Sequence, residues 1–160
     1  MMLRGVFLFV HVLGVALWLG LALVLSFVTG RARKEGGPET VAFAYRTSHR
    51  IMKTLGLAGM VLTVGGGAAL VMVAPEWSWF QAFPDHWLFQ MQILGFLAFA
   101  LGAFYQLPLG GRLADAAEAS AERGEATDDF RRFRKRYAVV ASVNGFILLL
   151  LVLLGTVRPM

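Results

Sequence analysis

The sequence predicts an all-α integral membrane protein, a four-helix bundle that forms a single transmembrane domain over residues 1–160. Its composition is 58% hydrophobic and only 16% charged, whereas soluble domains are about half apolar and about a quarter charged. Four apolar stretches are each long enough to cross roughly 30 Å of hydrocarbon. Basic residues gather in two of the three connections between these stretches. Together these observations favour a multi-pass membrane protein whose main surroundings are the lipid bilayer.

The four spans are predicted at residues 5–30, 51–74, 87–109 and 138–157. The first is too long for the hydrophobic region of a typical signal peptide and lacks a small-residue cleavage site, so we expect it to remain as a helix. In the first connection, Gly36, Gly37 and Pro38 predict a turn, and residues 39–49 fit a short interfacial helix.

Helical signals continue past the third span and begin again before the fourth. The stretch GRLADAAEASAERG is rich in helix formers and predicts that the third helix extends into the cytoplasm until Gly124 ends it. Thr127, followed by two aspartates, fits an N-cap with acids in the first turn. An apolar stripe at helical spacing then runs through Phe130, Phe133 and Tyr137. We therefore expect the fourth helix to begin well outside the bilayer, as an extension into the cytoplasm.

The distribution of charge predicts the orientation. Thirteen of the fifteen basic residues lie between positions 31–53 and 112–136, whereas the connection PEWSWFQAFPDH holds none. By the positive-inside rule the two basic connections are cytoplasmic and both termini lie outside. We expect the protein in the plasma (inner) membrane. The basic excess is a topology signal, so we expect no nucleic-acid partner. The absence of cysteine excludes disulfides, thiolate metal sites and cysteine catalysis.

His11 is the ionisable residue inside the first span. An ionisable group at membrane depth is costly and indicates a functional site by default, and imidazole is both a common metal ligand and an axial ligand of haem iron. A proton carrier or a hydrogen-bonded core histidine are the alternatives. Gly14 and Trp18 share its helical face, and Gly14 would let a flat group or another helix approach closely.

Residues 65–67 are three consecutive glycines in the second span, with Gly66 at the centre. Close helix packing needs a small residue only every fourth position, so we favour a bulky rigid group lying against this backbone. Counted along the helices, His11, the triplet and Met91 fall at similar depths in the outer half of the bilayer. They are predicted to line one pocket.

The third span opens with further candidates. Met91 is a soft thioether that is able to ligate haem iron, although a methionine in an apolar helix is normally a core residue. His86 lies at the outer interface, where it could ligate, relay protons or be solvated. We interpret His49 as a solvated surface residue and Asn144 as a residue that forms a hydrogen bond between helices.

The outer connection is aromatic, with its rings at Trp77, Trp79, Phe80, Phe83 and Trp87. These rings are typical of an interfacial aromatic belt, and some of them could also roof a cavity that opens on the outer face.

Several motifs resemble one superfamily of small four-helix membrane proteins. They are HVLGVALWLG in the first helix, RIMKTLGLAGMVLTVGGGAALV around the second, WLFQMQ in the third, RRFRKRY before the fourth and the closing VRPM. The superfamily includes the J-type protoporphyrinogen oxidases, the membrane domain of D-type copper-resistance proteins and related uncharacterised predicted integral membrane proteins. The resemblance implies a haem b site between helices one and three, with His11 as an axial ligand. In the oxidases helix three typically carries WLxxK, and the position of that lysine, counted from Trp87, is Met91 here.

The expectation is a haem b-binding membrane protein with a redox or haem-handling role. His11 is the first ligand, Met91 or His86 is the second, and Gly14, Trp18 and Gly66 contact the porphyrin. Three alternatives stay open: an oxidoreductase of the protoporphyrinogen oxidase type, a cofactor-free accessory subunit of a respiratory membrane complex, and copper uptake through histidines and methionines. A homo-oligomer or a larger membrane complex is compatible with each.

Overall fold

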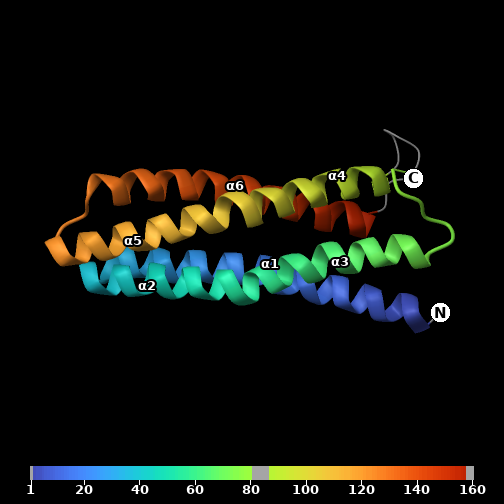
Figure 1. Ribbon diagram of the computed structural model, residues 1–160, viewed down its shortest axis with the longest axis horizontal. Helices are drawn as coiled ribbons and strands as arrows, with labels where there is room; N and C mark the ends of the chain where they lie inside the picture. The colour runs from blue at the N-terminus through green and yellow to red at the C-terminus, as the bar shows by residue number, and fades with distance from the viewer. Residues whose placement is uncertain (1, 81–86, 158–160) are drawn as a thin grey trace.

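Four long helical rods lie side by side in the computed structural model, which describes residues 2–80 and 87–157 (Figure 1). The first rod is α1 (Met2–Glu35), and the second is α2 (Pro38–Ile51), a π-helical turn η1 (Met52–Gly56) and α3 (Leu57–Val73). The third is α4 (Trp87–Ala100), a second π-helical turn η2 (Leu101–Gln106) and α5 (Leu107–Arg123), and the fourth is α6 (Asp128–Val157).

Each rod is long and apolar enough to cross a membrane, and no strand occurs in the described residues. The predicted four-helix membrane bundle is therefore confirmed.

The two ends of the bundle differ in their connections. We call the end with residues 74–80 and both described chain ends the aromatic end, and the end with the turns at residues 36–37 and 124–127 the basic end. Figure 1 shows that α1 begins and α6 ends at the same end of the bundle, as predicted. The side of the membrane that each end faces stays a prediction from the positive-inside rule.

The predicted interfacial helix exists, but it is α2 and runs without interruption through η1 into α3. The short helix predicted at residues 39–49 is thus the first part of a longer one, because the segment, although polar, has one apolar face buried against α5. Ala42 and Tyr45 pack there with Leu113, Ala117 and Phe130. This buried face keeps the chain helical beyond the apolar span.

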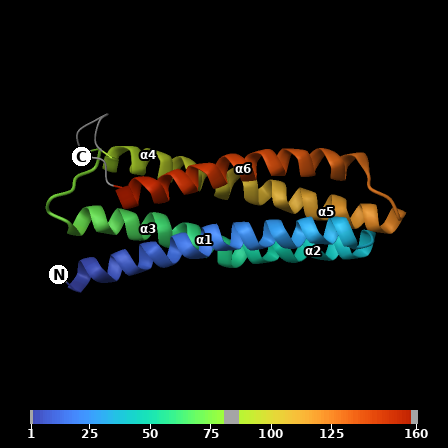
Figure 2. The ribbon, with the colours of Figure 1, turned by 180° about the vertical axis from the view of Figure 1, so that it is seen from behind.

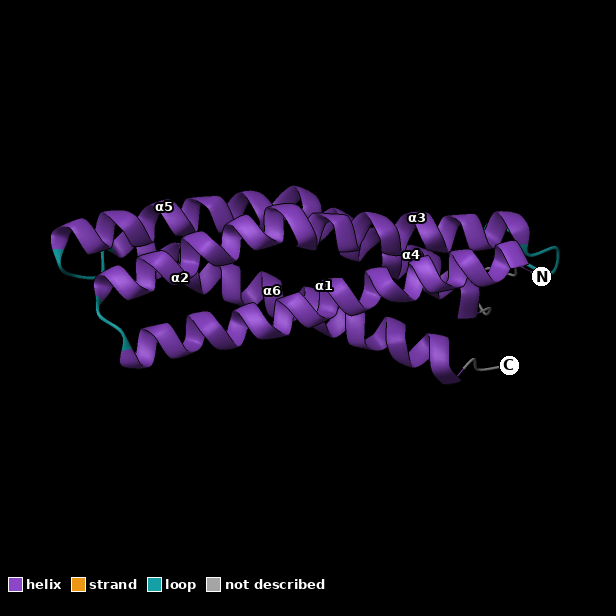
Figure 3. Ribbon diagram, turned by 90° about the horizontal axis from the view of Figure 1, so that it is seen from below, coloured by secondary structure: helices purple, strands orange, loops and turns teal. Residues whose placement is uncertain are grey.

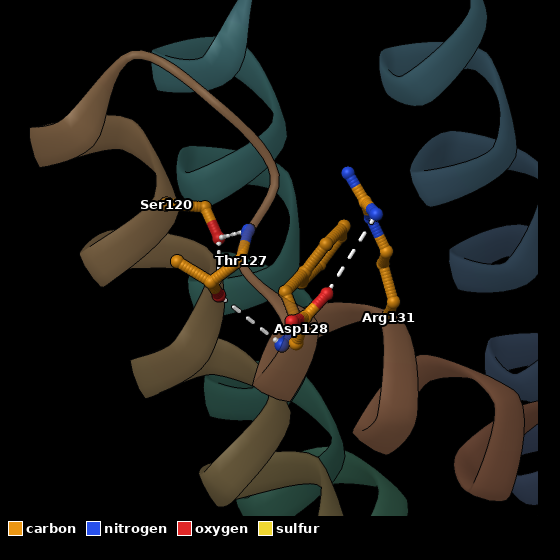
Figure 4. Close-up of polar contacts among 5 residues, drawn as sticks. Ser120, Thr127, Asp128 and Arg131 are labelled. Atoms are coloured by element: carbon orange, nitrogen blue, oxygen red, sulfur yellow. Dashed lines mark hydrogen bonds and ion pairs between the residues drawn. The ribbon is translucent and has the colours of Figure 1, made fainter.

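The end of α5 and the start of α6 agree with the sequence prediction (Figure 4). Gly124 adopts a left-handed conformation (φ 72°) and ends α5. The Thr127 hydroxyl then accepts a hydrogen bond from the backbone N–H of Phe130 at 3.2 Å, which is an N-cap contact. Ser120 of α5 accepts a hydrogen bond from the Thr127 backbone N–H at 3.1 Å, so the cap also joins the two helices.

The helices associate in pairs. α1 packs along α3, α4 packs along α6, and α2 packs along α5 toward the basic end. Seen from behind, α1 lies against α2 and α3 (Figure 2). A buried layer in the middle includes Trp18, Met60, Ala98, Ile147 and Leu148. Beyond this layer, toward the aromatic end, α1 and α6 diverge (Figure 3).

Candidate functional site: an apolar cavity with one histidine

A cavity of about 420 Å³ occupies the space between the α1–α3 pair and the α4–α6 pair at the aromatic end. This volume lies within the range of about 300–1,000 Å³ that is typical of small-molecule sites. Leu148 belongs both to its lining and to the buried middle layer, so that layer forms its floor. No described residue that lines it is Asp, Glu, Lys or Arg.

Three tryptophans, Trp77, Trp79 and Trp87, line the cavity near its outer end. The rings of Trp77 and Trp87 meet edge to face with centroids 5.8 Å apart, and Trp79 stacks on Phe96 at 6.4 Å. The aromatic residues therefore border a cavity, in line with the second of the two interpretations of this connection. Phe83 lies outside the described residues.

Gln92 ties the aromatic connection to α4. Its Oε1 accepts a hydrogen bond from the backbone N–H of Phe80 at 2.9 Å, and its Nε2 donates to the Ser78 carbonyl at 3.4 Å. Phe80 has a positive φ of 55°, a conformation that non-glycine residues rarely adopt. The buried Gln92 amide thus holds a strained segment in place beside the cavity.

His11 lines the same cavity, and its Nδ1 lies 2.7 Å from the backbone carbonyl oxygen of Thr63 in α3. A carbonyl oxygen only accepts hydrogen bonds, so Nδ1 carries the proton in this contact. In the neutral imidazole the lone pair is then on Nε2. Nε2 has no hydrogen-bond partner among the described residues, which leaves it available as a ligand.

Gly67 makes room for the ring of His11. A Cβ at position 67 would lie 3.2 Å from Nδ1 and 3.3 Å from Cε1 of the imidazole, which is tighter than ordinary van der Waals contact. The Nδ1–Cε1 edge of the ring therefore rests directly on the α3 backbone.

Gly14, Trp18 and Gly66 lie in the close interface of α1 and α3. A Cβ at Gly14 would overlap the Thr63 backbone nitrogen, and one at Gly66 would lie 2.8 Å from the His11 backbone nitrogen. Trp18 is 2% exposed. In this structure the backbone of α1 lies against Gly66. Porphyrin contact by Gly14, Trp18 and Gly66 stays a prediction.

Met91 of α4 lines the cavity together with His11. Its side chain lies toward Gly155 of α6, where a Cβ would be 3.5 Å from the methionine Cε and 3.9 Å from Sδ. His11 and Met91 line one pocket, as predicted, but of the glycine triplet only Gly67 is among its lining residues. His86 lies outside the described residues.

A family model described as a predicted integral membrane protein, DUF2269, matches residues 6–159. The chain belongs to this family. No curated protein and no solved structure matches it. Membership agrees with the four apolar rods, and the relation to protoporphyrinogen oxidases and copper-resistance domains stays a resemblance.

This DUF2269 protein has a group of hydrogen-bonded polar side chains between the middle layer and the basic end. Asn144, which is 2% exposed, donates from Nδ2 to Gln106 Oε1 at 3.0 Å, and Gln106 donates from Nε2 to the Tyr137 hydroxyl at 3.4 Å. The predicted hydrogen bond of Asn144 between helices is confirmed.

His49 rests on the backbone of α5 instead of projecting into solvent. A Cβ at Gly110 would lie 3.3 Å from its Nδ1, and one at Gly111 would lie 3.4 Å from its Nε2. Its Nδ1 is buried and has no hydrogen-bond partner among the described residues. The interpretation of His49 as a solvated residue was wrong, and the Gly110–Gly111 pair was the signal in the sequence that pointed to a close neighbour.

The methionines available for copper uptake in the spans do not gather at one place. Met60 is fully buried in the middle layer, Met72 is 74% exposed on the outer surface of α3, and Met91 lines the cavity. The described residues also contain no group of three or more His, Cys, Asp or Glu side chains that could hold a metal ion.

Proposed function

We propose that this DUF2269 protein binds haem b in the cavity at the aromatic end and has a redox or haem-handling role in the plasma membrane. The observation that carries the proposal is the hydrogen bond from His11 Nδ1–H to the Thr63 carbonyl. Histidines that ligate metals almost always donate their other ring N–H to a carbonyl, a carboxylate or water, which fixes the tautomer and the ring orientation. Haem, when bound, supplies reversible one-electron chemistry.

The residues of the cavity fit such a group. The walls are apolar and aromatic, which suits a flat tetrapyrrole, and the Nε2 of His11 is the atom that would ligate the iron. Met91 is the proposed second ligand because it lines the same cavity and methionine side chains are flexible. Histidine–methionine ligation raises the reduction potential of a haem.

The helix interface supports the ligand. Gly14 and Gly66 let α1 approach α3 closely enough for His11 to reach a main-chain carbonyl. In the proposal these two glycines position the imidazole.

The alternatives gain less support from the packing. A cofactor-free accessory subunit would use the glycine-rich face of the second helix as its contact surface, but Gly59 and Gly66 already face α1. Copper uptake would need neighbouring methionines, and those of the outer half are apart. An oxidase-like activity is less supported because this chain has methionine where the protoporphyrinogen oxidases typically have lysine. Complementation of a strain that lacks its own protoporphyrinogen oxidase tests this alternative.

The first experiment is an absorption spectrum of the detergent-purified protein, oxidised and then reduced with dithionite, before and after haem is added. We expect a Soret band that sharpens on reduction, with distinct α and β bands. His11→Ala should lose this absorbance, while His49→Ala, which changes a histidine far from the cavity, should keep it. A wild-type protein that stays colourless with added haem overturns the proposal. Full absorbance in His11→Ala overturns the assignment of the ligand.

A further inference from the structure

We propose that Arg4 is the carboxylate-binding group of the cavity, so that its ligand is a tetrapyrrole with free carboxylates that lie toward the aromatic end. The inference rests on the proposed haem site and deepens it by naming the ligand class and its orientation.

Arg4 is not a lining residue itself, but it lies over the ring of Trp77, which lines the cavity. Its guanidinium carbon is 5.0 Å from the centroid of the Trp77 ring. A guanidinium that lies over an aromatic ring is attracted by the ring's π-face, which fixes the position of this long side chain. Its rigid fork of N–H groups suits a carboxylate in two-point contact.

The distribution of charge leaves the cavity with one cation for an acidic ligand. Thirteen of the fifteen basic residues belong to the connections at the basic end, and Arg158 lies outside the described residues. Arg4 is therefore the cation that the described residues place at the aromatic end. Since no described residue in the cavity lining is Asp, Glu, Lys or Arg, a carboxylate deep in the cavity would be unpaired, which is costly. A ligand with carboxylates thus favours the orientation that brings them to Arg4.

Glu76 already shows a carboxylate bound to Arg4. It forms an ion pair with the guanidinium, and the side chains are 45% and 48% exposed. Its own backbone N–H and the Arg4 guanidinium lower the pKa of the Glu76 carboxyl, so it is ionised at neutral pH. Exposed ion pairs contribute little net free energy. A ligand carboxylate is therefore able to replace Glu76, and Glu76 acts as an internal competitor.

The test compares haem with its dimethyl ester, which has the same ring and iron but no free carboxylate. Both are titrated into the detergent-solubilised protein and followed by the Soret band. Wild type should bind haem up to about fivefold more tightly than the ester, the upper end for an ion pair of an exposed arginine. Arg4→Gln should lose this preference and keep its affinity for the ester. Glu76→Gln should bind haem about two- to threefold more tightly, because the competitor is gone, with the ester unaffected.

Matched variants separate the outcomes. Arg31→Gln, an arginine of α1 that pairs with Glu35 at the basic end, should behave as wild type, and Arg4→Lys should retain part of the preference. If haem binds but wild type does not prefer it over the ester, or Arg4→Gln keeps the preference, the inference is wrong and the haem site stands. Equal loss of both ligands in Arg4→Gln would also overturn it, because that result marks a structural role. Failure of wild type to bind either ligand would instead overturn the proposed function.

Discussion

The two halves of this bundle use the same four rods in opposite ways. At the basic end, α2, α5 and α6 close around side chains such as Leu113 and Ala117, each 1% exposed, and the rings of Tyr45 and Phe130 meet edge to face at 5.4 Å. At the aromatic end the helix pairs separate and leave a cavity of about 420 Å³. The basic half gains stability from filling its interior, and the aromatic half keeps space for a ligand.

The middle layer makes this difference possible. Trp18 and Met60 are 2% and 0% exposed and pack against Gly102, where a Cβ would lie 3.0 Å from Met60 Cε and 3.2 Å from Trp18 Cζ2. The middle layer therefore separates the hydrogen-bonded side chains of Asn144 and Gln106 from the cavity. Each half is therefore open to change without direct effect on the other, and the following variants test that independence.

The largest effect is expected from Gly66→Ala. The new Cβ would lie 2.8–2.9 Å from the His11 backbone, so α1 and α3 must separate. We expect a loss of about 1–3 kcal/mol, the usual range for overpacking, measured by thermal unfolding in detergent. The matched control is Gly65→Ala, whose Cβ meets nothing within 4 Å. Equal stability of the two variants would refute the close interface.

Gly67→Ala should separate ligand binding from packing. Its Cβ presses on the imidazole at 3.2–3.3 Å and not on the α1 backbone, so the ring must shift and its hydrogen bond to Thr63 weakens. We expect haem affinity to fall about tenfold, as for other losses of a ligand's hydrogen-bond partner, with little change in unfolding temperature. A Soret titration beside a melting curve measures both, and unchanged affinity would mean that the ring position is not critical.

Thr127→Ala tests the basic half alone. Loss of the N-cap contact to Phe130 should cost about 1 kcal/mol, while haem absorbance stays as in wild type. Thr127→Ser, which keeps the hydroxyl, should recover most of the stability in the same unfolding assay. A change in the haem spectrum of Thr127→Ala would show that the two halves are coupled.

The smallest effect is expected within the Asn144–Gln106 pair. Interhelical hydrogen bonds in membranes contribute about 0.6 kcal/mol on average. A double-mutant cycle of Asn144→Leu and Gln106→Leu should give a coupling energy of about that size. A coupling energy near zero would mean that the contact at 3.0 Å has no energetic role.

Much of the fold was predictable because it depends on local signals. Hydropathy located all four spans, and Gly124 and Thr127 marked the end of α5 and the start of α6 through their own backbone preferences. Depth counting along the helices was enough to place His11 and Met91 at one cavity.

The missed features depend on which helix lies next to which. The polar segment α2 stays helical because α5 covers one face, and His49 is held by glycines more than sixty positions away. The carbonyl of Thr63 as the partner of His11 likewise follows from the helix crossing and not from any motif. Charge and hydropathy patterns carry no information on such pairs.

The helical rods are longer than the membrane is thick, so part of the bundle lies outside the lipid. The third rod contains 37 residues, which at 1.5 Å per residue is about 55 Å, whereas the hydrocarbon layer is about 30 Å thick. With the tryptophans at one interface, roughly 25 Å of the bundle rises above the opposite membrane face as a stalk in water. The tip of that stalk is the turn at Gly124, where no neighbouring atom lies within 4 Å of a Cβ. A fluorescent domain inserted there would stand clear of the lipid headgroups and report on the protein without touching its membrane-embedded half.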